Sequence, residues 1–461
     1  MLNEKKLKKN KIFFKKIEMV IKPSCFEIDM ADKNHLNLII TGHIDNGKST
    51  TMGHFLMDLG VVDERTIAQH AEESEKTGKG DTFKYAWVMD NIKDERERGI
   101  TIDLAFQKFE TPKYFFTLID APGHRDFIKN MITGASEADC AVLVLSAKEG
   151  ETDTAIAPGG QAREHAFLLK TLGVNQIIVA INKMDDSNYS EDVFKAAKAK
   201  GEALVKSVGY KIENVPFIPV SGWKGDNLVK KSENMPWWTG KTLLEAFDDF
   251  TYPEKPTGKP LRVPIQDVYT ITGVGTVPVG RVETGTMKPN DKIIIMPSGA
   301  VGEIKSIETH HTEMPSASAG DNIGFNLRGI EKKDIKRGDV MGTPDKPPMV
   351  ANEFRAQIIV IHHPTAIAPG YTPVMHCHTA QVAATVVAFE AKINPASGAV
   401  EEENPKFLKV GDSAIVRIKP VRPTPIETFA EFPEMGRFAL RDMGATIAAG
   451  IVKDITEEYK P

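Results

Sequence analysis

Leu36-Asn37-Leu38-Ile39-Ile40-Thr41 runs directly into Gly42-His43-Ile44-Asp45-Asn46-Gly47-Lys48-Ser49, and this junction decides the fold around it. The short apolar run, β-branched toward its end, is typical of a buried parallel strand. Gly42 and Gly47 allow the tight turn in which consecutive backbone N–H groups converge on an anion. A loop of this kind, placed between a strand and a helix that begins near Lys48, predicts a phosphate-binding site.

The residue types in this loop suit a nucleotide triphosphate and its metal ion. We expect Lys48 to pair with the β- and γ-phosphates, and the Ser49 hydroxyl to complete a Mg²⁺ shell. The following helix adds the positive end of its dipole. An ordinary Gly-rich turn is the alternative, but the position between strand and helix argues against it. The predicted phosphate-binding residues are Gly42, His43, Ile44, Asp45, Asn46, Gly47, Lys48, Ser49 and Thr50.

A second string, Asp120-Ala121-Pro122-Gly123, ends the predicted strand Tyr114 to Ile119. The Asp120 carboxylate can hold a Mg²⁺-bound water, and the Gly123 N–H can bind the γ-phosphate and move when that phosphate leaves. Thr101 is predicted to lie on a mobile loop, where its hydroxyl reaches Mg²⁺ while the triphosphate is bound. The alternative is that Thr101 is an ordinary threonine of a β-strand. The predicted metal ligands are therefore Ser49, Thr101 and Asp120.

The third string, Asn182-Lys183-Met184-Asp185, ends the predicted strand Gln176 to Ile181 and is expected to read the base. Asp185 can accept hydrogen bonds from N1–H and the N2 amine of guanine, groups that adenine lacks, so ATP would leave this carboxylate unpaired. Ser221-Gly222-Trp223, after the strand-like run Val215 to Val220, can offer a backbone N–H to the guanine carbonyl. Together the strings predict a GTP-driven switch with GTP or GDP and Mg²⁺ as cofactors.

His124 follows the γ-phosphate string directly. A histidine there can orient a water for attack, because phosphoryl transfer depends on positioning more than on covalent chemistry. A solvated loop histidine is the alternative. His124 joins Asp45, Thr101 and Gly123 in the predicted catalytic set.

Longer blocks make the chain resemble the elongation factor 1-alpha family of translation factors and, more distantly, bacterial elongation factor Tu. The resemblance runs from about Lys33 to Lys453 and is carried by Arg96 to Asp103, Asp120 to Ile132 and Gly436 to Met443. It implies a GTP hydrolase that carries aminoacyl-tRNA to the ribosomal A site and hydrolyses GTP on codon recognition. It also implies an exchange factor of the elongation factor 1-beta type and a monomeric protein.

Roles carry over where the residues match. His124 falls on the family's catalytic histidine, and Ile44 and Ile100 fall on the apolar pair that restrains it. Asp45 falls on a carboxylate near the phosphates, while Asn46 stands where relatives often have histidine or serine and should point away from phosphate. The tRNA-binding positions are Gln266, Asp267, Tyr269, Glu308, His310 and Asn322 at the aminoacyl end, and Lys129, Asn130 and Arg337 near the 5′ phosphate. These residue types suit stacking and base-edge contacts, although each alone also suits a barrel rim.

The order of segments predicts an α/β P-loop GTPase domain with a mostly parallel doubly wound sheet (33–252), followed by two all-β barrel domains (260–345 and 350–456). Helical stretches such as Glu191 to Val208 alternate with strand runs before a linker, Pro253 to Pro260. Short β-branched runs, such as Gly273 to Val277 and Asp291 to Met296, recur beyond it.

The composition limits the class of protein. A chain of 461 residues suits about three domains, and a net charge of −5 means that RNA contacts must use local basic patches. Cys25, Cys140 and Cys377 lie far apart, which fits a reducing cytoplasm, and no apolar run approaches the length of a membrane span. We expect no metal at His362-His363 or His376-Cys377-His378, because strand alternation puts the cysteine opposite its two neighbours.

Residues 1–29 differ from the rest in carrying many lysines around Ile12-Phe13-Phe14. We expect either extra residues from an upstream start codon or a disordered arm that binds RNA phosphates. A signal peptide is not expected, because the apolar core is short and broken by lysine.

Three other functions are the alternatives to an aminoacyl-tRNA carrier. A paralogue that delivers a release or ribosome-rescue factor is the nearest alternative, but such relatives usually have longer N-terminal extensions and lose part of the aminoacyl pocket. The GTPase subunit of ATP sulfurylase has a similar architecture and would need a catalytic partner and sulfate chemistry, which nothing in the sequence indicates. For a non-catalytic or cytoskeletal role the sequence carries no signal.

Overall fold

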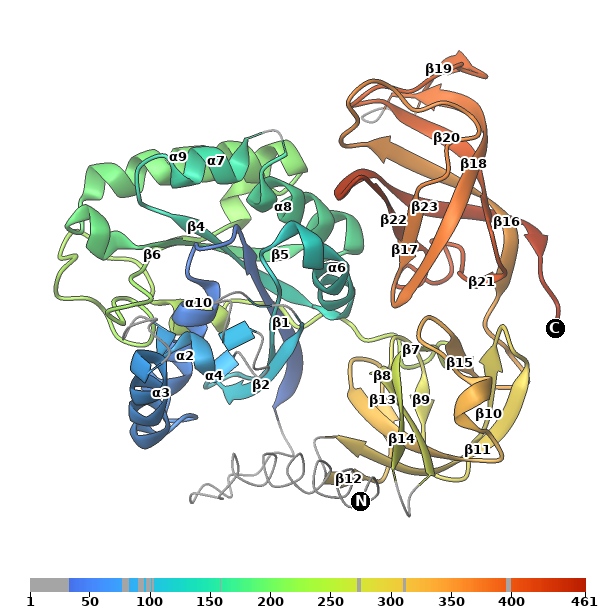
Figure 1. Ribbon diagram of the computed structural model, residues 1–461, viewed down its shortest axis with the longest axis horizontal. Coiled ribbons are helices and arrows are strands. Elements are labelled where there is room, and N and C mark those ends of the chain that lie inside the picture. The colour runs from blue at the N-terminus through green and yellow to red at the C-terminus, as the bar shows by residue number, and fades with distance from the viewer. Residues whose placement is uncertain are drawn as a thin grey trace. The chain divides into compact units, whose positions relative to one another are not determined.

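The computed structural model describes residues 33–76, 83–89, 95–96, 101, 103–157, 159–271, 275–309, 312–394 and 399–461. Residues 1–29, Ile100, His310 and part of the run Gly273 to Val277 lie outside these ranges. Residues 35–461 fold together, with an α/β part followed by two all-β parts (Figure 1).

A mostly parallel sheet forms the centre of the α/β part. Its strands are β1 (Asn34–Gly42), β2 (Ala105–Glu110), β3 (Tyr114–Asp120), β4 (Cys140–Ser146), β5 (Gln176–Asn182) and β6 (Phe217–Pro219). Their order is β2-β3-β1-β4-β5-β6. β1 pairs with β4, β4 with β5 and β5 with β6 in parallel, whereas β2 and β3 are antiparallel. The predicted sheet is therefore confirmed.

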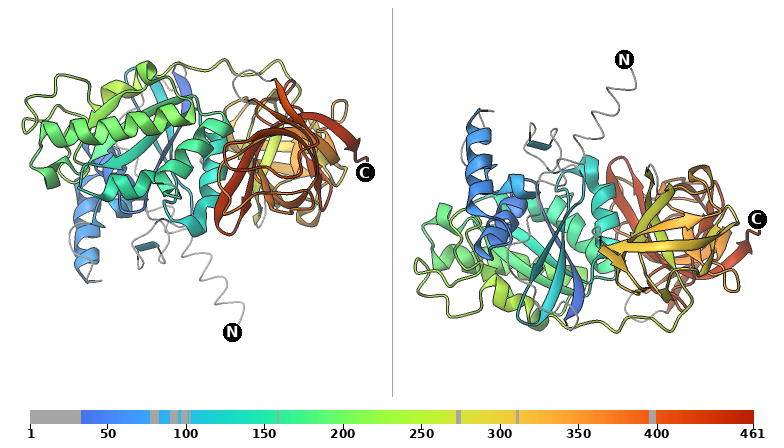
Figure 2. Two further views of the ribbon diagram at one scale, coloured as in Figure 1. Left: turned by 90° about the horizontal axis from the view of Figure 1, so that it is seen from above. Right: turned by 90° about the horizontal axis from the view of Figure 1, so that it is seen from below.

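Helices cover both faces of this sheet, because its strands are apolar on both sides. They are α2 (Lys48–Asp58), α3 (Glu64–Lys76), α4 (Ala86–Met89), α6 (Ile128–Glu137), α7 (Glu151–Ile156), α8 (Gln161–Leu172), α9 (Glu191–Val208) and α10 (Leu243–Phe247). Neighbouring residues of β4 serve opposite cores: Leu143 packs with α6, α8 and α9, and Val142 with α2 and α10. Figures 1 and 2 show the sheet between these helices.

The first barrel (residues 263–342) consists of a seven-stranded antiparallel sheet and a separate antiparallel pair formed by the two short strands at 286–287 and 317–318. Its strands are β7 (Val263–Ile271), β8 (Gly275–Arg281), β9 (Thr286–Met287), β10 (Lys292–Met296), β11 (Ala300–Thr309), β12 (Thr312–Met314), β13 (Ala317–Ser318), β14 (Asn322–Arg328) and β15 (Val340–Gly342). The main order is β10-β15-β7-β8-β14-β11-β12, and β10 also pairs with β11. That extra pairing closes the sheet, so its strands do not leave long open edges.

The second barrel (residues 350–458) closes in the same way. Its strands are β16 (Val350–Val360), β17 (Val374–Cys377), β18 (Ala380–Ile393), β19 (Val400–Glu403), β20 (Ser413–Pro420), β21 (Thr424–Pro425), β22 (Arg437–Asp442) and β23 (Ala445–Glu458). Their order is β17-β22-β23-β16-β20-β18-β19, with β21 on β16, and β17 also pairs with β18. Among the described residues, no helix has the length and apolar character needed to cross a bilayer.

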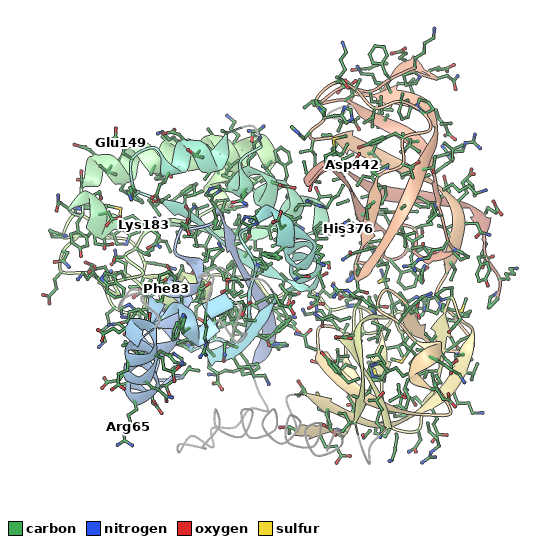
Figure 3. All side chains as sticks on the ribbon, in the orientation of Figure 1. Arg65, Phe83, Glu149, Lys183, His376 and Asp442 are labelled. Atoms are coloured by element: carbon green, nitrogen blue, oxygen red, sulfur yellow. The ribbon has the colours of Figure 1, made fainter. Side chains whose placement is uncertain are left out.

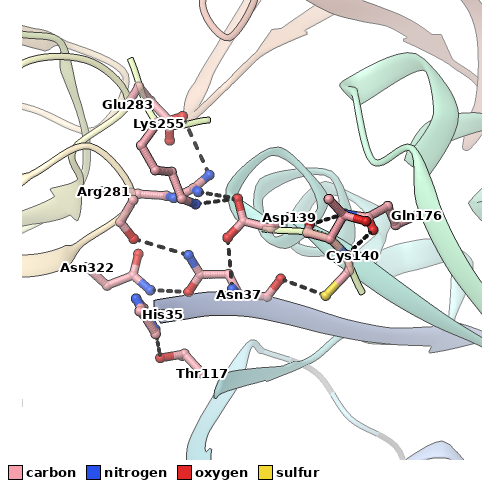
Figure 4. A network of polar contacts seen from close by, with 12 residues as sticks. His35, Asn37, Thr117, Asp139, Cys140, Gln176, Lys255, Arg281, Glu283 and Asn322 are labelled. Atoms are coloured by element: carbon pink, nitrogen blue, oxygen red, sulfur yellow. Dashed lines mark hydrogen bonds and ion pairs between the residues drawn. The ribbon is translucent and has the colours of Figure 1, made fainter. Parts of the chain in front are cut away.

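A buried charge network joins the α/β part to the first barrel (Figure 4). Asp139 Oδ1 lies 2.8 Å from both Lys255 Nζ and Arg281 Nη2, and its Oδ2 accepts from the Asn37 N–H at 2.9 Å. Arg281 Nη1 lies 3.5 Å from Glu283 Oε2. Lys255 belongs to the predicted linker, so this connection is anchored rather than free along its length.

Candidate nucleotide-binding site

The predicted phosphate loop lies between β1 and α2, and α2 begins at Lys48. Gly47 has a φ of 80°, and a Cβ there would lie 2.5 Å from Asn182 Nδ2, so glycine is required. Lys48 Nζ donates to the His43 carbonyl at 3.0 Å. A Cβ on Gly123 would overlap this ammonium group. The two strings predicted to hold the terminal phosphates are therefore direct neighbours.

Two buried side chains of α8 hold the backbone of the phosphate loop. Gln161 Oε1 accepts from the Ile44 N–H at 3.2 Å. His165 Nδ1 lies 3.3 Å from the Gly42 nitrogen and 2.8 Å from Thr41 Oγ1. Burial lowers the pKa of His165 to about 3, so the ring is neutral at pH 7 and Nδ1 can accept.

The same turn of α8 contacts the second barrel. Glu164 Oε1 accepts from Arg441 Nη1 at 2.7 Å, from the Thr446 N–H at 2.9 Å and from Thr446 Oγ1 at 2.6 Å. Arg441 and Thr446 lie on the paired strands β22 and β23. One helical turn thus connects the phosphate loop with the second barrel. The sequence analysis missed Gln161, Glu164 and His165.

The three predicted metal ligands meet in the structure. Ser49 Oγ lies 2.6 Å from Asp120 Oδ2 and 3.1 Å from Thr101 Oγ1. Burial raises the pKa of Asp120 to about 6, and its Oδ1 is buried with no hydrogen-bond partner among the described residues. A carboxylate oxygen left without a partner beside two hydroxyls fits Mg²⁺, which prefers oxygen ligands. Within the described ranges, no cluster of three His, Cys, Asp or Glu side chains offers another metal site.

The two strings predicted to bind the base (residues 182–185 and 221–223) are linked by hydrogen bonds to each other and to the phosphate loop. Asn182 Nδ2 donates to the Asn46 carbonyl at 2.8 Å, and Asn182 Oδ1 accepts from the Gly222 N–H at 2.8 Å. Asp185 Oδ1 accepts from Ser221 Oγ at 2.6 Å. The three strings therefore form one connected set of loops at the carboxyl ends of parallel strands, where open α/β sheets bind ligands.

Other predicted cofactor residues lie on the same loops. The Asn46 side chain donates to the Val144 carbonyl of β4 at 2.9 Å, and its place relative to the phosphates stays a prediction. Lys183, labelled in Figure 3, has its Nζ 2.7 Å from Glu151 Oε2, a partner that the sequence analysis did not identify. The remaining members of these loops are Thr50 at the start of α2, Ala121 and Pro122 after β3, Met184 after β5, and Trp223 after β6.

His124 lies immediately after the γ-phosphate string, with 36% of its side chain exposed. Its Nδ1 accepts from the Asp126 N–H at 3.2 Å, so in the neutral ring the hydrogen is on Nε2. The ring also contacts Phe127, with centroids 5.8 Å apart. The contacts with Asp126 and Phe127 fix the orientation of the His124 ring.

Asp45, in the phosphate loop itself, has a φ of 63°.

Several residues predicted at the aminoacyl end share one face of the first barrel. Strand register aligns Asp267, Val279, Gly324 and Glu308 in a row across β7, β8, β14 and β11, and such neighbours lie on the same side of a sheet. Gly324 contributes no side chain to the row, and a Cβ there would be in ordinary contact with Val279 at 3.6 Å. Tyr269, further along β7, is 50% exposed.

Two other residues of this group are placed differently. Gln266 is partly buried on β7. Asn322 Nδ2 donates to Asn37 Oδ1 on β1 at 2.8 Å, so its amide takes part in the contact between the α/β part and the first barrel.

The residues predicted near the tRNA 5′ phosphate come together from separate parts of the chain. Lys129 and Asn130 lie on α6. Arg337 Nη2 donates to Thr133 Oγ1 at 3.1 Å, and Thr133 Oγ1 donates to the Lys129 carbonyl at 3.2 Å. His376 of β17 lies near this group, and its pKa is lowered to about 3 by burial and by surrounding cations that include Arg337 and Lys129.

Comparisons with known proteins cover nearly the whole chain. The family model described as "Elongation factor Tu GTP binding domain" matches residues 33–253, "Elongation factor Tu domain 2" matches 275–342, and "GTP-eEF1A C-terminal domain-like" matches 353–453. Elongation factor 1-alpha of Cenarchaeum symbiosum is 88% identical over 431 residues, which are 94% of this chain and 99% of that protein. Elongation factor 1-alpha of Methanocaldococcus jannaschii is 58% identical over 426 residues, which are 92% of this chain and 98% of that protein.

Structural similarity supports the fold. The GTPase-like domain of S. cerevisiae Ski7 bound to GTP matches with a TM-score of 0.75 at 17% identity, over 92% of this chain and 99% of that one. This confirms the predicted P-loop GTPase domain followed by β-barrels, and the sequence relatives confirm an elongation factor and GTP hydrolase. The chain therefore belongs to the elongation factor 1-alpha family of translation factors.

Proposed function

We propose that this protein carries aminoacyl-tRNA to the ribosomal A site in a complex with GTP and Mg²⁺ and hydrolyses GTP on codon recognition. The observation that carries the proposal is the meeting of Ser49, Thr101 and Asp120, since it joins a segment distant in sequence to the phosphate loop. Mg²⁺ bound by these three residues would neutralise charge on the β- and γ-phosphates. Thr101 and Gly123 are then the groups that lose their partner when the terminal phosphate leaves.

In this proposal the chain orients the reactants and does no covalent chemistry. Lys48 binds the β- and γ-phosphates, Asp185 reads guanine, and His124 positions the attacking water. The hydrogen bond from the Asp126 N–H to the Nδ1 of His124 supports this role because it leaves the Nε2 side of the ring for the water. Asp45 lies in the loop beside the phosphates.

The cargo is proposed to bind across the first barrel and α6. The row that contains Asp267, Gly324 and Glu308, with the exposed Tyr269 on the same strand as Asp267, suits the aminoacyl group and the terminal adenosine, since an exposed aromatic ring can stack on a base. The Lys129 and Arg337 cluster suits the 5′ phosphate.

We further propose a cytoplasmic monomer that is recharged by an exchange factor of the elongation factor 1-beta type. The described cysteines, Cys140 and Cys377, are free and buried, and burial raises the pKa of both thiols. Unpaired, unreactive thiols fit a reducing compartment.

Protection of the aminoacyl ester tests the cargo assignment. Hydrolysis of the ester should slow strongly with protein and GTP, but not with protein and GDP, and uncharged tRNA should bind poorly. Tyr269→Ala should weaken protection, whereas Val301→Ala, which truncates another exposed side chain of the same barrel, should not. Equal protection with GDP and GTP would refute the proposal.

A further inference from the structure

Gly222, the central residue of the base loop (residues 221–223), is held on both sides by side chains. Its N–H donates to Asn182 Oδ1 at 2.8 Å, and its carbonyl lies 2.9 Å from His54 Nδ1. A carbonyl oxygen only accepts, so His54 Nδ1 must carry the hydrogen of this bond. His54 is 6% exposed and belongs to α2, the helix that begins with Lys48. A buried side chain of the phosphate-binding helix therefore fixes the base loop.

The base loop packs directly on α2. A Cβ on Gly222 would overlap the Thr51 hydroxyl and would lie 2.9 Å from Thr51 Cα. A Cβ on Gly225 would lie 3.0 Å from the His54 ring. The loop therefore cannot move toward the helix, and the hydrogen bond from His54 opposes movement away from it.

The His54 ring is itself held in place. It stacks on Tyr85, with ring centroids 4.1 Å apart and planes 7° from parallel, and its Nε2 lies 3.6 Å from Asp58 Oδ1. Tyr85 also meets Trp223 of the base loop edge-on, with centroids 5.8 Å apart. Lys84 Nζ lies 5.2 Å from the centre of the Tyr85 ring and 5.0 Å from that of Trp223. The segment that contains Tyr85 thus braces both His54 and the loop.

We propose that His54 is a positioning residue for guanine selection. By donating to the Gly222 carbonyl, His54 fixes the position of the base loop (residues 221–223). It thereby sets the point at which a backbone N–H of this loop meets the guanine O6. The inference rests on the proposed reading of guanine by this loop. Asp185 belongs to a different string and reads N1 and N2, so loss of His54 should weaken the recognition of O6 more than that of N2.

Two substitutions of the same residue separate the hydrogen bond from the volume of the ring. His54→Leu keeps apolar bulk and removes the donor. His54→Asn can place its Nδ2 near the site of the histidine Nδ1, because both nitrogens are bonded to Cγ. His363→Leu is the matched control, since His363 lies in the second barrel, where its ring meets Tyr371 edge-on with centroids 5.6 Å apart.

Binding of three nucleotides to the full-length protein measures the effect. GDP is compared with 2-aminopurine riboside diphosphate, which lacks O6 and the N1 hydrogen, and with inosine diphosphate, which lacks only the N2 amine; the N1 contribution is common to wild type and variant and cancels when the two are compared. His54→Leu should lower the preference for GDP over the 2-aminopurine nucleotide about tenfold, as expected for loss of one positioning hydrogen bond. The preference for GDP over inosine diphosphate should change less than about twofold. His54→Asn and the control should stay close to wild type.

Three results would overturn the assignment: an unchanged O6 preference in His54→Leu, an Asn variant as defective as the Leu variant, or an equal loss of both preferences. Wild-type protein that binds ADP as well as GDP would instead refute the guanine site itself, so the two failures are distinguishable. If His54→Leu does not fold, ¹⁵N NMR of histidine-labelled wild-type protein decides the question. Nδ1 of His54 should be protonated, and an Nδ1 without hydrogen would refute the proposal.

Discussion

Replacing Arg281 by methionine should destabilise the protein strongly, because this guanidinium lies between carboxylates contributed by the α/β part and the first barrel. It is 2.8 Å from Asp139 and 3.5 Å from Glu283, and all three side chains are buried. Removing one partner of a buried ion pair typically costs about 3–5 kcal/mol. Lys255 would still neutralise Asp139, and Glu283 can take up a proton because burial raises its pKa to about 7. We therefore expect the lower end of the range, about 3 kcal/mol at pH 7.5.

Differential scanning calorimetry of the GDP-bound protein measures this loss. A change of about 3 kcal/mol should lower Tm by roughly 3 °C, because the unfolding entropy of a unit that spans residues 35–461 is about 0.9 kcal/mol/K. Arg328→Met is the matched control, because the Arg328 pair with Glu303 is largely exposed and should contribute less than about 1 kcal/mol. The loss caused by Arg281→Met should also shrink at pH 6, where Glu283 would be protonated. If Arg281→Met and Arg328→Met melt within about 1 °C of each other, the buried network does not stabilise this junction.

Three further outcomes follow from the site and the junction. Asp185→Asn should weaken GDP binding about 100-fold and favour xanthine nucleotides, as measured by nucleotide titration. Asp186→Asn, which changes the exposed neighbour, should leave GDP binding unchanged. Retained guanine selectivity in Asp185→Asn would contradict the assignment of Asp185 to the base. His124→Ala should leave nucleotide binding near normal and lower ribosome-stimulated GTP hydrolysis by about 100-fold or more in single-turnover assays. His362→Ala is the control, and stimulation that survives in His124→Ala would exclude His124 as the water-positioning group. Burial raises the pKa of Glu137 from 4.5 to about 8, so its contribution to stability is present below pH 4.5 and is lost as pH rises toward 8. The Glu137→Gln variant should therefore show a flatter pH dependence of Tm in this window and should melt above wild type at pH 8.5. An unchanged slope of Tm against pH would show that Glu137 does not titrate there.

Local chemistry explains what the sequence could predict. The phosphate loop, the Asp120 string and the Asn182 string are each contiguous, and their partners are backbone groups or a ligand. The helix Glu191–Val208 was predicted with the bounds that the structure has, because its N-cap Ser190 and C-terminal Gly209 are local signals. The strand predicted over Val215 to Val220 is shorter in the structure, where β6 spans Phe217–Pro219, because Pro216 and Pro219 cannot donate to a ladder.

Contacts between distant segments could not be predicted in this way. His54 meets Gly222 across 168 positions of sequence, and His165 meets Gly42 across 123, so no local pattern marks either histidine. Asn322 is predicted at the aminoacyl end, and that assignment stays a prediction; the hydrogen bond from its amide to Asn37, 285 positions away, has no signal in the sequence. Such contacts depend on the tertiary arrangement of the α/β part, the barrels and the connection between them.

The ion pair of Lys255 with Asp139 shortens the tether that carries the first barrel. With Lys255 fixed, the chain between it and Pro260 has a contour length of about 17 Å, whereas the whole connection from Pro253 would reach about 25 Å. The effective concentration of a tethered partner falls roughly as the −3/2 power of the tether length. Breaking this one contact would therefore lower the effective concentration of the barrel at its docking surface by a factor of about 1.8, which makes redocking slower without changing the surface itself.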